Sequence, residues 1–208
     1  MNCHGCRKHC TSQSPPRQGG LFKWFGGNRQ DPSPLPEKLS QIALVGTPNV
    51  GKSVLFSALT GRYVTVSNYP GTTVEVAWGK MPLGDGEIAI VDTPGMYSLL
   101  PITDEERVAR DLLLDTSVDL VIHVIDAKNL GRMLPLTLQL IEAGLPVLLA
   151  INMMDEAERI GLQVRQEHLE AELGIPVITL TATQRVGVRI LKQRIADYVN
   201  APQLSPTT

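Results

Sequence analysis

The segment Ile42-Ala-Leu-Val-Gly-Thr-Pro-Asn-Val-Gly-Lys-Ser53 decides the fold of this chain. Its last eight residues fit G-x-x-x-x-G-K-[ST], the loop that wraps nucleotide phosphates. The apolar run before the loop predicts a buried strand, and residues 54–59 after it can continue as a helix. Backbone N–H groups then point at the phosphates, Lys52 reaches the β- and γ-phosphates, and Ser53 ligates Mg²⁺. The expected nucleotide-binding residues here are Gly46, Asn49, Val50, Gly51, Lys52, Ser53 and Val54.

A second apolar run, residues 88–91, ends in the D-x-x-G sequence Asp92-Thr-Pro-Gly95. A carboxylate at a strand end that faces the phosphate loop is suited to a water-mediated Mg²⁺ contact. Gly95 has no Cβ, so it can offer its N–H to a γ-phosphate at close range. D-x-x-G alone is a weak signal, but its position about forty residues after Lys52 makes it specific.

A third apolar run, residues 147–151, leads into Asn152-Met-Met-Asp155. Asp155 is expected to accept hydrogen bonds from N1–H and the 2-amino group of guanine, whereas adenine would leave the carboxylate unpaired. Asn152 would tie this loop to the phosphate loop, and Met153 would cover the base with an apolar side chain. The alternative for Asp155 is the cap of a helix. The guanine loop after the last strand is expected at Thr181, Ala182 and Thr183.

In this order the three motifs define a GTPase, and they closely resemble the cytoplasmic G domain of the bacterial ferrous iron transport protein B family. The resemblance also rests on Tyr69-Pro-Gly-Thr-Thr-Val-Glu75 and on Asp92-Thr-Pro-Gly-Met-Tyr-Ser-Leu99, and it covers about residues 40 to 200. It implies slow GTP hydrolysis that gates Fe(II) uptake. It also implies a position at the inner face of the bacterial inner membrane, with a membrane permease domain as partner.

The resemblance further implies a switch loop over about residues 61–74. Gly71, Thr72 and Thr73 lie in this loop, and Thr73 aligns with the Thr that ligates Mg²⁺ in the GTP state. The alternative for both threonines is β-propensity at the start of a strand.

Met96 follows D-x-x-G, where Ras-like GTPases carry a Gln that orients the attacking water. A thioether cannot hold that water. Resembling GTPases use a bound K⁺, with the Asn of the phosphate loop as one ligand, and this chain has Asn49 there. The alternative for Asn49 is a turn residue. The catalytic candidates are therefore Lys52, Thr73 and Asn49.

Apolar strands that alternate with helices predict an α/β fold, a P-loop NTPase of the Ras-like G-domain type. We expect a mostly parallel six-stranded sheet with one antiparallel edge strand and helices on both faces. The expected strands are 41–46, 74–81, 87–92, 118–125, 146–152 and 176–180, and the expected helices are 52–60, 104–114, 131–143, 165–173 and 187–199. Ligands bind at the carboxyl ends of the strands in such sheets. His123, inside an apolar strand, is expected to be structural.

Composition favours one soluble domain, because 208 residues carry 43% hydrophobic residues and a net charge of −2. No apolar run is long enough to span a bilayer, no secretory signal is visible, and the charge argues against nucleic acid as a partner. We divide the chain into a flexible Pro/Gly-rich arm (1–40), a GTP-binding G domain (41–200) and a polar tail or linker (201–208). The linker-like ending is compatible with a piece of a longer protein and with a stand-alone domain.

The three cysteines lie in the arm, as Cys3-His-Gly-Cys6-Arg-Lys-His-Cys10. C-x₂-C-x₃-C with interleaved His is a candidate zinc or iron site, and a reduced tail without metal is the alternative. Two other functions are therefore compatible with the sequence: a ribosome-assembly or tRNA-modification GTPase, and a metal-sensing module that acts through Cys3, Cys6 and Cys10. A homo-oligomer that pairs across the switches is also compatible with it.

Overall fold

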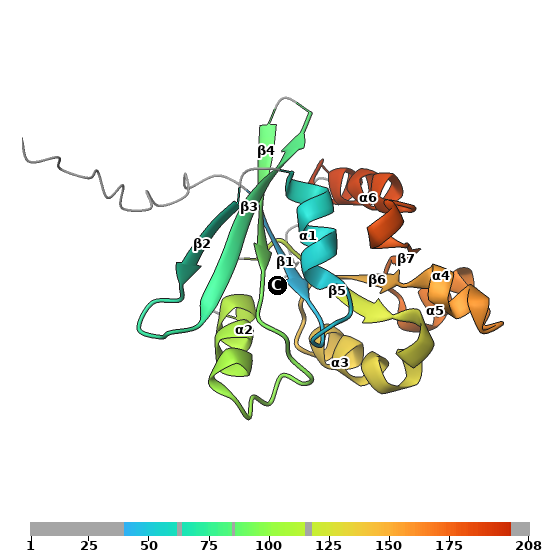
Figure 1. The fold of residues 1–208 in the computed structure, drawn as a ribbon, viewed down its shortest axis with the longest axis horizontal. Helices are drawn as coiled ribbons and strands as arrows, with labels where there is room; N and C mark the ends of the chain where they lie inside the picture. The colour runs from blue at the N-terminus through green and yellow to red at the C-terminus, as the bar shows by residue number, and fades with distance from the viewer. Residues whose placement is uncertain (1–39, 62–63, 85, 115–117, 201–208) are drawn as a thin grey trace, which may run out of the picture. The chain divides into compact units, whose positions relative to one another are not determined.

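The computed structural model describes residues 40–61, 64–84, 86–114 and 118–200, which form a mixed α/β fold (Figure 1). The strands are β1 (Gln41–Val45), β2 (Val64–Asn68), β3 (Glu75–Leu83), β4 (Gly86–Asp92), β5 (Leu120–Asp126), β6 (Val147–Asn152) and β7 (Val177–Thr179). The helices are α1 (Lys52–Thr60), α2 (Asp104–Leu114), α3 (Leu130–Glu142), α4 (Met154–Arg159), α5 (Gln166–Leu173) and α6 (Val188–Asn200), with short 3₁₀ segments η1 (Ala127–Asn129) and η2 (Ala182–Gln184).

The strands form one seven-stranded sheet in the order β2-β3-β4-β1-β5-β6-β7. From β4 to β7 all neighbours pair in parallel, whereas β3 is antiparallel to both β2 and β4. The predicted fold class is confirmed, but the sheet has one strand more than expected. β2 falls within the expected switch loop and was not predicted as a strand. Its residues Val64 and Val66 are 43% and 57% exposed, so this edge strand shows no alternation of buried and exposed residues.

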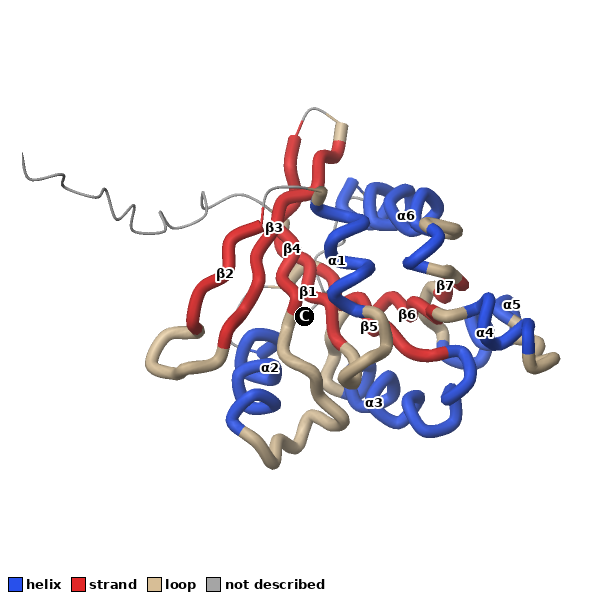
Figure 2. Tube along the Cα trace, viewed as in Figure 1, coloured by secondary structure: helices blue, strands red, loops and turns tan. Residues whose placement is uncertain are grey.

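Alternate residues of the central strands supply the two faces of the sheet. Ile42 and Leu44 of β1 belong to the cluster packed by α1 and α6, whereas Ala43 and Val45 belong to the cluster packed by α2 and α3. A third cluster holds α4 and α5 against β6 and β7. Figure 2 shows these helical layers around the sheet. None of the helices in the described ranges is both long and apolar enough to cross a bilayer.

The five predicted helices are present within one residue of their expected limits, and α4 was not predicted. Its six residues are too few to show a helical period. Asp155 lies in its first turn, so its helix-terminal position and its expected role toward guanine are compatible. The loops after β1, β4, β6 and β7 therefore carry the phosphate loop, D-x-x-G, N-x-x-D and the expected guanine loop to the carboxyl edge of the sheet.

His123 of β5 is fully buried, as expected of a structural residue. Its Nδ1 lies 2.9 Å from Oγ1 of Thr137 on α3, and within the described part of the chain its Nε2 has no hydrogen-bond partner. Burial lowers the pKa of His123 to about 3. The imidazole therefore stays neutral in the folded chain at pH values where the unfolded chain protonates it.

This shift predicts a loss of stability in mild acid. The folded pKa lies below the unfolded value of 6.5, so the stabilisation is fully present above pH 6.5 and decreases as the pH falls toward 3. Between pH 7 and pH 5 we expect His123 to lower the free energy of unfolding by about 2 kcal/mol. Urea unfolding of the native chain and of a His123→Val/Thr137→Val variant at both pH values measures it. An equal pH dependence in the two proteins would show that His123 is not responsible.

Candidate functional site

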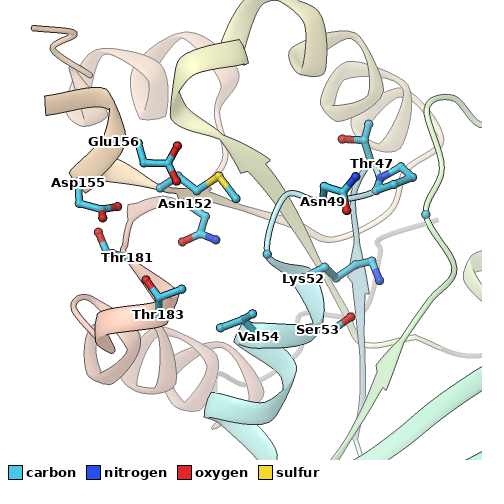
Figure 3. Close-up of a pocket in the computed structure, with 14 residues that line it drawn as sticks. Thr47, Asn49, Lys52, Ser53, Val54, Asn152, Asp155, Glu156, Thr181 and Thr183 are labelled. Atoms are coloured by element: carbon cyan, nitrogen blue, oxygen red, sulfur yellow. The ribbon is translucent and has the colours of Figure 1, made fainter. Parts of the chain in front are cut away.

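A cavity of about 440 Å³ lies where the loops after β1, β4, β6 and β7 converge (Figure 3). Its lining comes from the phosphate loop, D-x-x-G, N-x-x-D and the expected guanine loop. One end carries cationic and hydroxyl groups, and the other carries carboxylates. The lining residues are Thr47, Pro48, Asn49, Gly51, Lys52, Ser53, Val54, Gly95, Asn152, Met153, Asp155, Glu156, Thr181 and Thr183.

The glycines of the phosphate loop are required by close packing. A Cβ on Gly46 would lie 2.4 Å from the carbonyl oxygen of Val124, and one on Gly51 would lie 2.4 Å from Nδ2 of Asn152. Gly51 also has a φ of 84°, in the left-handed region that favours glycine, where it caps α1. These two residues allow the loop to turn sharply from β1 into α1, so that the helix N-terminus faces the cavity.

Lys52 connects the phosphate loop with the end of β4. Its Nζ donates hydrogen bonds to Oδ1 of Asp92 and, at 2.5 Å, to the carbonyl oxygen of Thr93. The Lys52 and Asp92 side chains are only 11% and 10% exposed, so water screens this ion pair weakly. Asp92 does not line the cavity directly, but it holds the ammonium group that does.

The segment after Asp92 packs tightly on the phosphate loop. A Cβ on Gly95 would lie 2.7 Å from Cγ of Pro48, and the N–H of Met96 donates to the carbonyl oxygen of Gly46 at 3.1 Å. The Met96 side chain is fully buried in the core shared with α2 and α3. It therefore points away from the cavity, in addition to lacking a group that could orient water.

Asn152 joins three loops at the other end of the cavity. Its Nδ2 donates to the carbonyl oxygen of Val50 at 2.9 Å, and its Oδ1 accepts from the N–H of Ala182 at 2.9 Å. The hydrogen bond from Asn152 to the phosphate loop was expected, whereas the hydrogen bond between Asn152 and η2 was not. Met153 has a φ of 62° and caps α4, and this backbone turn carries Asp155 to the rim.

Asp155 is held by two side chains that no sequence motif predicts. Its Oδ2 accepts hydrogen bonds from Nη2 of Arg159 at 3.1 Å and from Nε2 of Gln184 at 3.2 Å. Beside it, Glu156 pairs with Lys128, and the hydrogen bond to that carboxylate raises the pKa of Lys128. Because Gln184 belongs to η2, the two segments expected to surround the base are linked directly.

The expected switch residues lie elsewhere in this structure. Gly71, Thr72 and Thr73 line a separate hollow of about 610 Å³ between the β2–β3 turn and α2. Thr72 fixes the turn, because its Oγ1 donates to the carbonyl oxygen of Tyr69 at 3.0 Å and accepts from the N–H of Val74 at 3.2 Å. Thr73 therefore borders α2 and does not line the cavity that carries Lys52 and Asp155.

The loop between Met96 and α2 is anchored by Glu106. Its carboxylate accepts hydrogen bonds from the N–H groups of Ile102, Tyr97 and Thr103, at 2.9, 3.2 and 3.4 Å, and these bonds, first that of Ile102, lower its pKa. The N–H of Glu106 donates to Oγ1 of Thr103 at 3.2 Å, which completes a capping box. This carboxylate belongs to a helix start, as the sequence predicts.

Thr47, Pro48 and Glu156 line the cavity and were not predicted. Thr47 and Pro48 occupy variable positions of the phosphate-loop pattern, so no sequence signal selects them. Glu156 directly follows N-x-x-D, and that adjacency was a usable signal. Cys3, Cys6 and Cys10 lie outside the described residues, and within the described ranges no three or more His, Cys, Asp or Glu side chains are grouped to hold a metal ion.

The residues at the cationic end of the cavity nevertheless have the chemistry to hold Mg²⁺. This ion prefers oxygen ligands and usually takes only one or two from the protein, with waters and phosphates completing the shell. Ser53 offers a hydroxyl at the first turn of α1, and Asp92 offers a carboxylate at the end of β4. Asp92 already pairs with the ammonium of Lys52, the residue next to Ser53 in the chain.

This sheet, with its glycine-bounded loop opening into α1, defines a P-loop NTPase of the G-domain class. A family model described as ferrous iron transport protein B matches residues 40–195. The chain therefore belongs to the ferrous iron transport protein B family.

Individual relatives agree with this assignment. The chain is 43% identical over 161 residues to the Fe(2+) transporter FeoB of Escherichia coli strain K12. The aligned segment covers 76% of this chain and 21% of the relative. It thus spans about a fifth of that protein's length. The G domain of the T. maritima FeoB iron transporter is 39% identical, with a TM-score of 0.73 over 78% of this chain and 100% of that one. A GDP form of the cytosolic domain of the same transporter gives 39% identity and a TM-score of 0.76, over 80% of this chain and 66% of that one.

Proposed function

We propose that this chain binds and hydrolyses GTP as the switch of a ferrous iron transporter, with residues 41–200 as its G domain. The observation that carries the proposal is one cavity with Lys52 and Ser53 at one end and Asp155 at the other. Its relatives support it, because one of them is described in a GDP form and others as Fe(2+) transporters. The chain would face the cytosol and act on a membrane portion of the transporter.

The phosphate end has the chemistry for a nucleoside triphosphate. N–H groups of the loop and of the first turn of α1, with the ammonium of Lys52, would bind the β- and γ-phosphate oxygens. Lys52 would turn from Asp92 to the phosphates, and this turn frees the carboxylate. Mg²⁺ held by Ser53 and Asp92 would neutralise charge on these phosphates. Gly95 would donate its N–H to the γ-phosphate from a position that Pro48 closes to any side chain.

The base end has the chemistry for guanine. Asp155 would accept from N1–H and the 2-amino group, Met153 would cover one face of the base, and the N–H groups of η2 would reach O6. The hydrogen bonds from Gln184 and Arg159 hold Oδ2 of Asp155 at the rim before any base arrives. This preorganisation lowers the entropy cost of binding and favours guanine over adenine.

Catalysis would need a positive charge that the described side chains near Met96 do not supply. We propose a K⁺ ion with Asn49 as one ligand, where it would offset charge that develops between the β- and γ-phosphates. GTP hydrolysis is expected to be faster in KCl than in NaCl by about tenfold or more. Single-turnover assays of the native chain and of Asn49→Ala measure this, and the variant should lose the difference. Equal rates of the native chain in both salts would refute the assignment.

Thr73 would ligate Mg²⁺ only after the β2–β3 turn leaves its present position. The change would break the pairing of Asn68 with Glu75, the pair next to the β2–β3 turn, and it resembles other switch transitions of GTPases. We therefore predict that a disulfide between cysteines at positions 68 and 75 slows hydrolysis about tenfold or more, while GDP affinity changes little. Both native side chains are exposed, so the fold should tolerate the exchange.

The effect of this disulfide is tested in an Asn68→Cys/Glu75→Cys variant of a chain whose Cys3, Cys6 and Cys10 are replaced by Ser. Turnover is compared in the oxidised and reduced forms of the same sample. The reduced form is the matched control, because it carries the same substitutions without the bond. Equal turnover in both forms would show that β2 stays paired during hydrolysis.

A further inference from the structure

A second hollow adjoins the nucleotide cavity between α1 and η2. Its volume is about 420 Å³, and it shares Ser53, Val54 and Thr183 with the nucleotide cavity. In Figure 3, Val54 and Thr183 lie between the base end, marked by Asp155, and the phosphate end, marked by Lys52. A nucleotide held at both ends must pass its ribose over these shared residues. The second hollow therefore opens on the ribose side of the proposed nucleotide site.

Arg185 gives this hollow a positive charge. Its side chain lines the hollow and is exposed, and among the described residues no ion pair involves it. Residues 181–196 carry four cationic side chains and no acidic one, although the whole chain has a net charge of −2. The local field on this side of the ribose is therefore suited to an anion.

The backbone around Arg185 is well fixed. Thr181 and Val186 exchange backbone hydrogen bonds of 3.0 and 3.2 Å, and the N–H of Arg185 donates to the carbonyl oxygen of Ala182 at 3.1 Å. Within this turn Arg185 has a φ of 58°, in the left-handed region that Gly or Asn adopts more easily. The backbone conformation of the turn therefore gives no reason for an arginine at position 185. The turn instead fixes this side chain beside the hollow.

From these observations we propose that the hollow between α1 and η2 is a subsite for an anionic group on the ribose. The ligand class is a guanine nucleotide with additional phosphate on its 2′- or 3′-hydroxyl. The guanidinium of Arg185 would form charge-assisted hydrogen bonds to that phosphate, and the hydroxyl of Thr183 would donate a further one. This inference rests on the proposed function, because base and 5′-phosphates must first be anchored in the adjoining cavity.

The test compares the binding of GDP and of guanosine 5′-diphosphate 3′-diphosphate to the full chain by calorimetry, at fixed Mg²⁺ and salt. The native chain should bind the 3′-phosphorylated nucleotide about tenfold more tightly than GDP, as expected for one added charge-assisted contact. Arg185→Ala should lose this preference and keep its GDP affinity. Arg189→Ala, which removes an exposed arginine outside the hollow, is the matched control and should keep both.

Two further variants separate the charge from the turn. Arg185→Lys keeps a cation and should retain part of the preference, whereas Arg185→Gly relieves the backbone conformation and should lose all of it while the chain stays folded. A native chain that binds GDP without preferring the 3′-phosphorylated nucleotide would overturn the subsite alone. An equal loss of both nucleotides in Arg185→Ala would also overturn it, because Arg185 would then support the turn. Failure of the native chain to bind GDP would overturn the proposed function and the subsite together.

Discussion

Replacement of Asp155 by Asn is expected to lower the affinity for GDP by about a hundredfold or more and to favour xanthine nucleotides. The carboxylate would accept two hydrogen bonds from guanine, and each bond to a charged group contributes about 1.5–3 kcal/mol. The amide of Asn offers an N–H where guanine also has one, whereas xanthine presents a carbonyl oxygen at that position. The change should therefore reverse the preference rather than abolish binding.

Competition of GDP and xanthosine 5′-diphosphate for a fluorescent nucleotide measures this reversal. Glu158→Gln is the matched control, because Glu158 is exposed on the same short helix, α4, and does not line the cavity. The native position of Asp155 depends on Gln184 and Arg159, so the variant's circular dichroism and melting temperature should be recorded beside its affinity. Unchanged GDP affinity in Asp155→Asn would remove Asp155 from the base site.

Replacement of Lys52 by Ala is expected to abolish phosphate-dependent binding and to lower GTP hydrolysis by on the order of a thousandfold. The side chain of Lys52 is 11% exposed, and its ammonium group is held between Asp92 and the carbonyl oxygen of Thr93. Its charge therefore acts in a poorly solvated place, where electrostatic stabilisation of phosphates is strong. The variant also leaves the Asp92 carboxylate unpaired, which further repels an anionic ligand.

Guanosine, which lacks phosphates, separates this effect from general unfolding. Lys52→Ala should lose the affinity difference between GTP and guanosine while its affinity for guanosine stays close to the native value. Lys80→Ala is the control, because Lys80 forms an exposed ion pair with Glu87 in the β3–β4 hairpin, away from the cavity. Normal turnover in Lys52→Ala would exclude Lys52 from phosphate binding.

Predictions from the sequence succeeded where a short segment dictates its own geometry. Gly46 and Gly51 are the positions where a Cβ would meet Val124 and Asn152, so the glycine pattern encodes the loop that follows β1. Apolar runs likewise predicted the buried strands, including β5 with its single His123. Prediction failed for β2 and α4, because an exposed edge strand and a six-residue helix bury too few residues to leave a hydrophobic period.

The residues of the candidate site also divide into those that the sequence predicted and those that it did not. The expected residues of the phosphate loop, Gly95, Asn152 and Asp155 meet at one edge of the sheet, because parallel strands bring the loops that follow them together. Gln184 and Arg159 were missed because neither belongs to a recurring pattern. Their importance arises only from their hydrogen bonds to Asp155.

The sequence by itself determined the class of this domain, the positions of its buried strands along the chain and the chemical groups at both ends of the cavity. Those features depend on local spacing and on hydrophobic periodicity. Only the tertiary structure decided that Thr73 lies beside α2, that Met96 is buried, and that Arg185 borders a hollow between α1 and η2. Each of these positions depends on contacts between segments far apart in the chain, and no local pattern encodes such contacts.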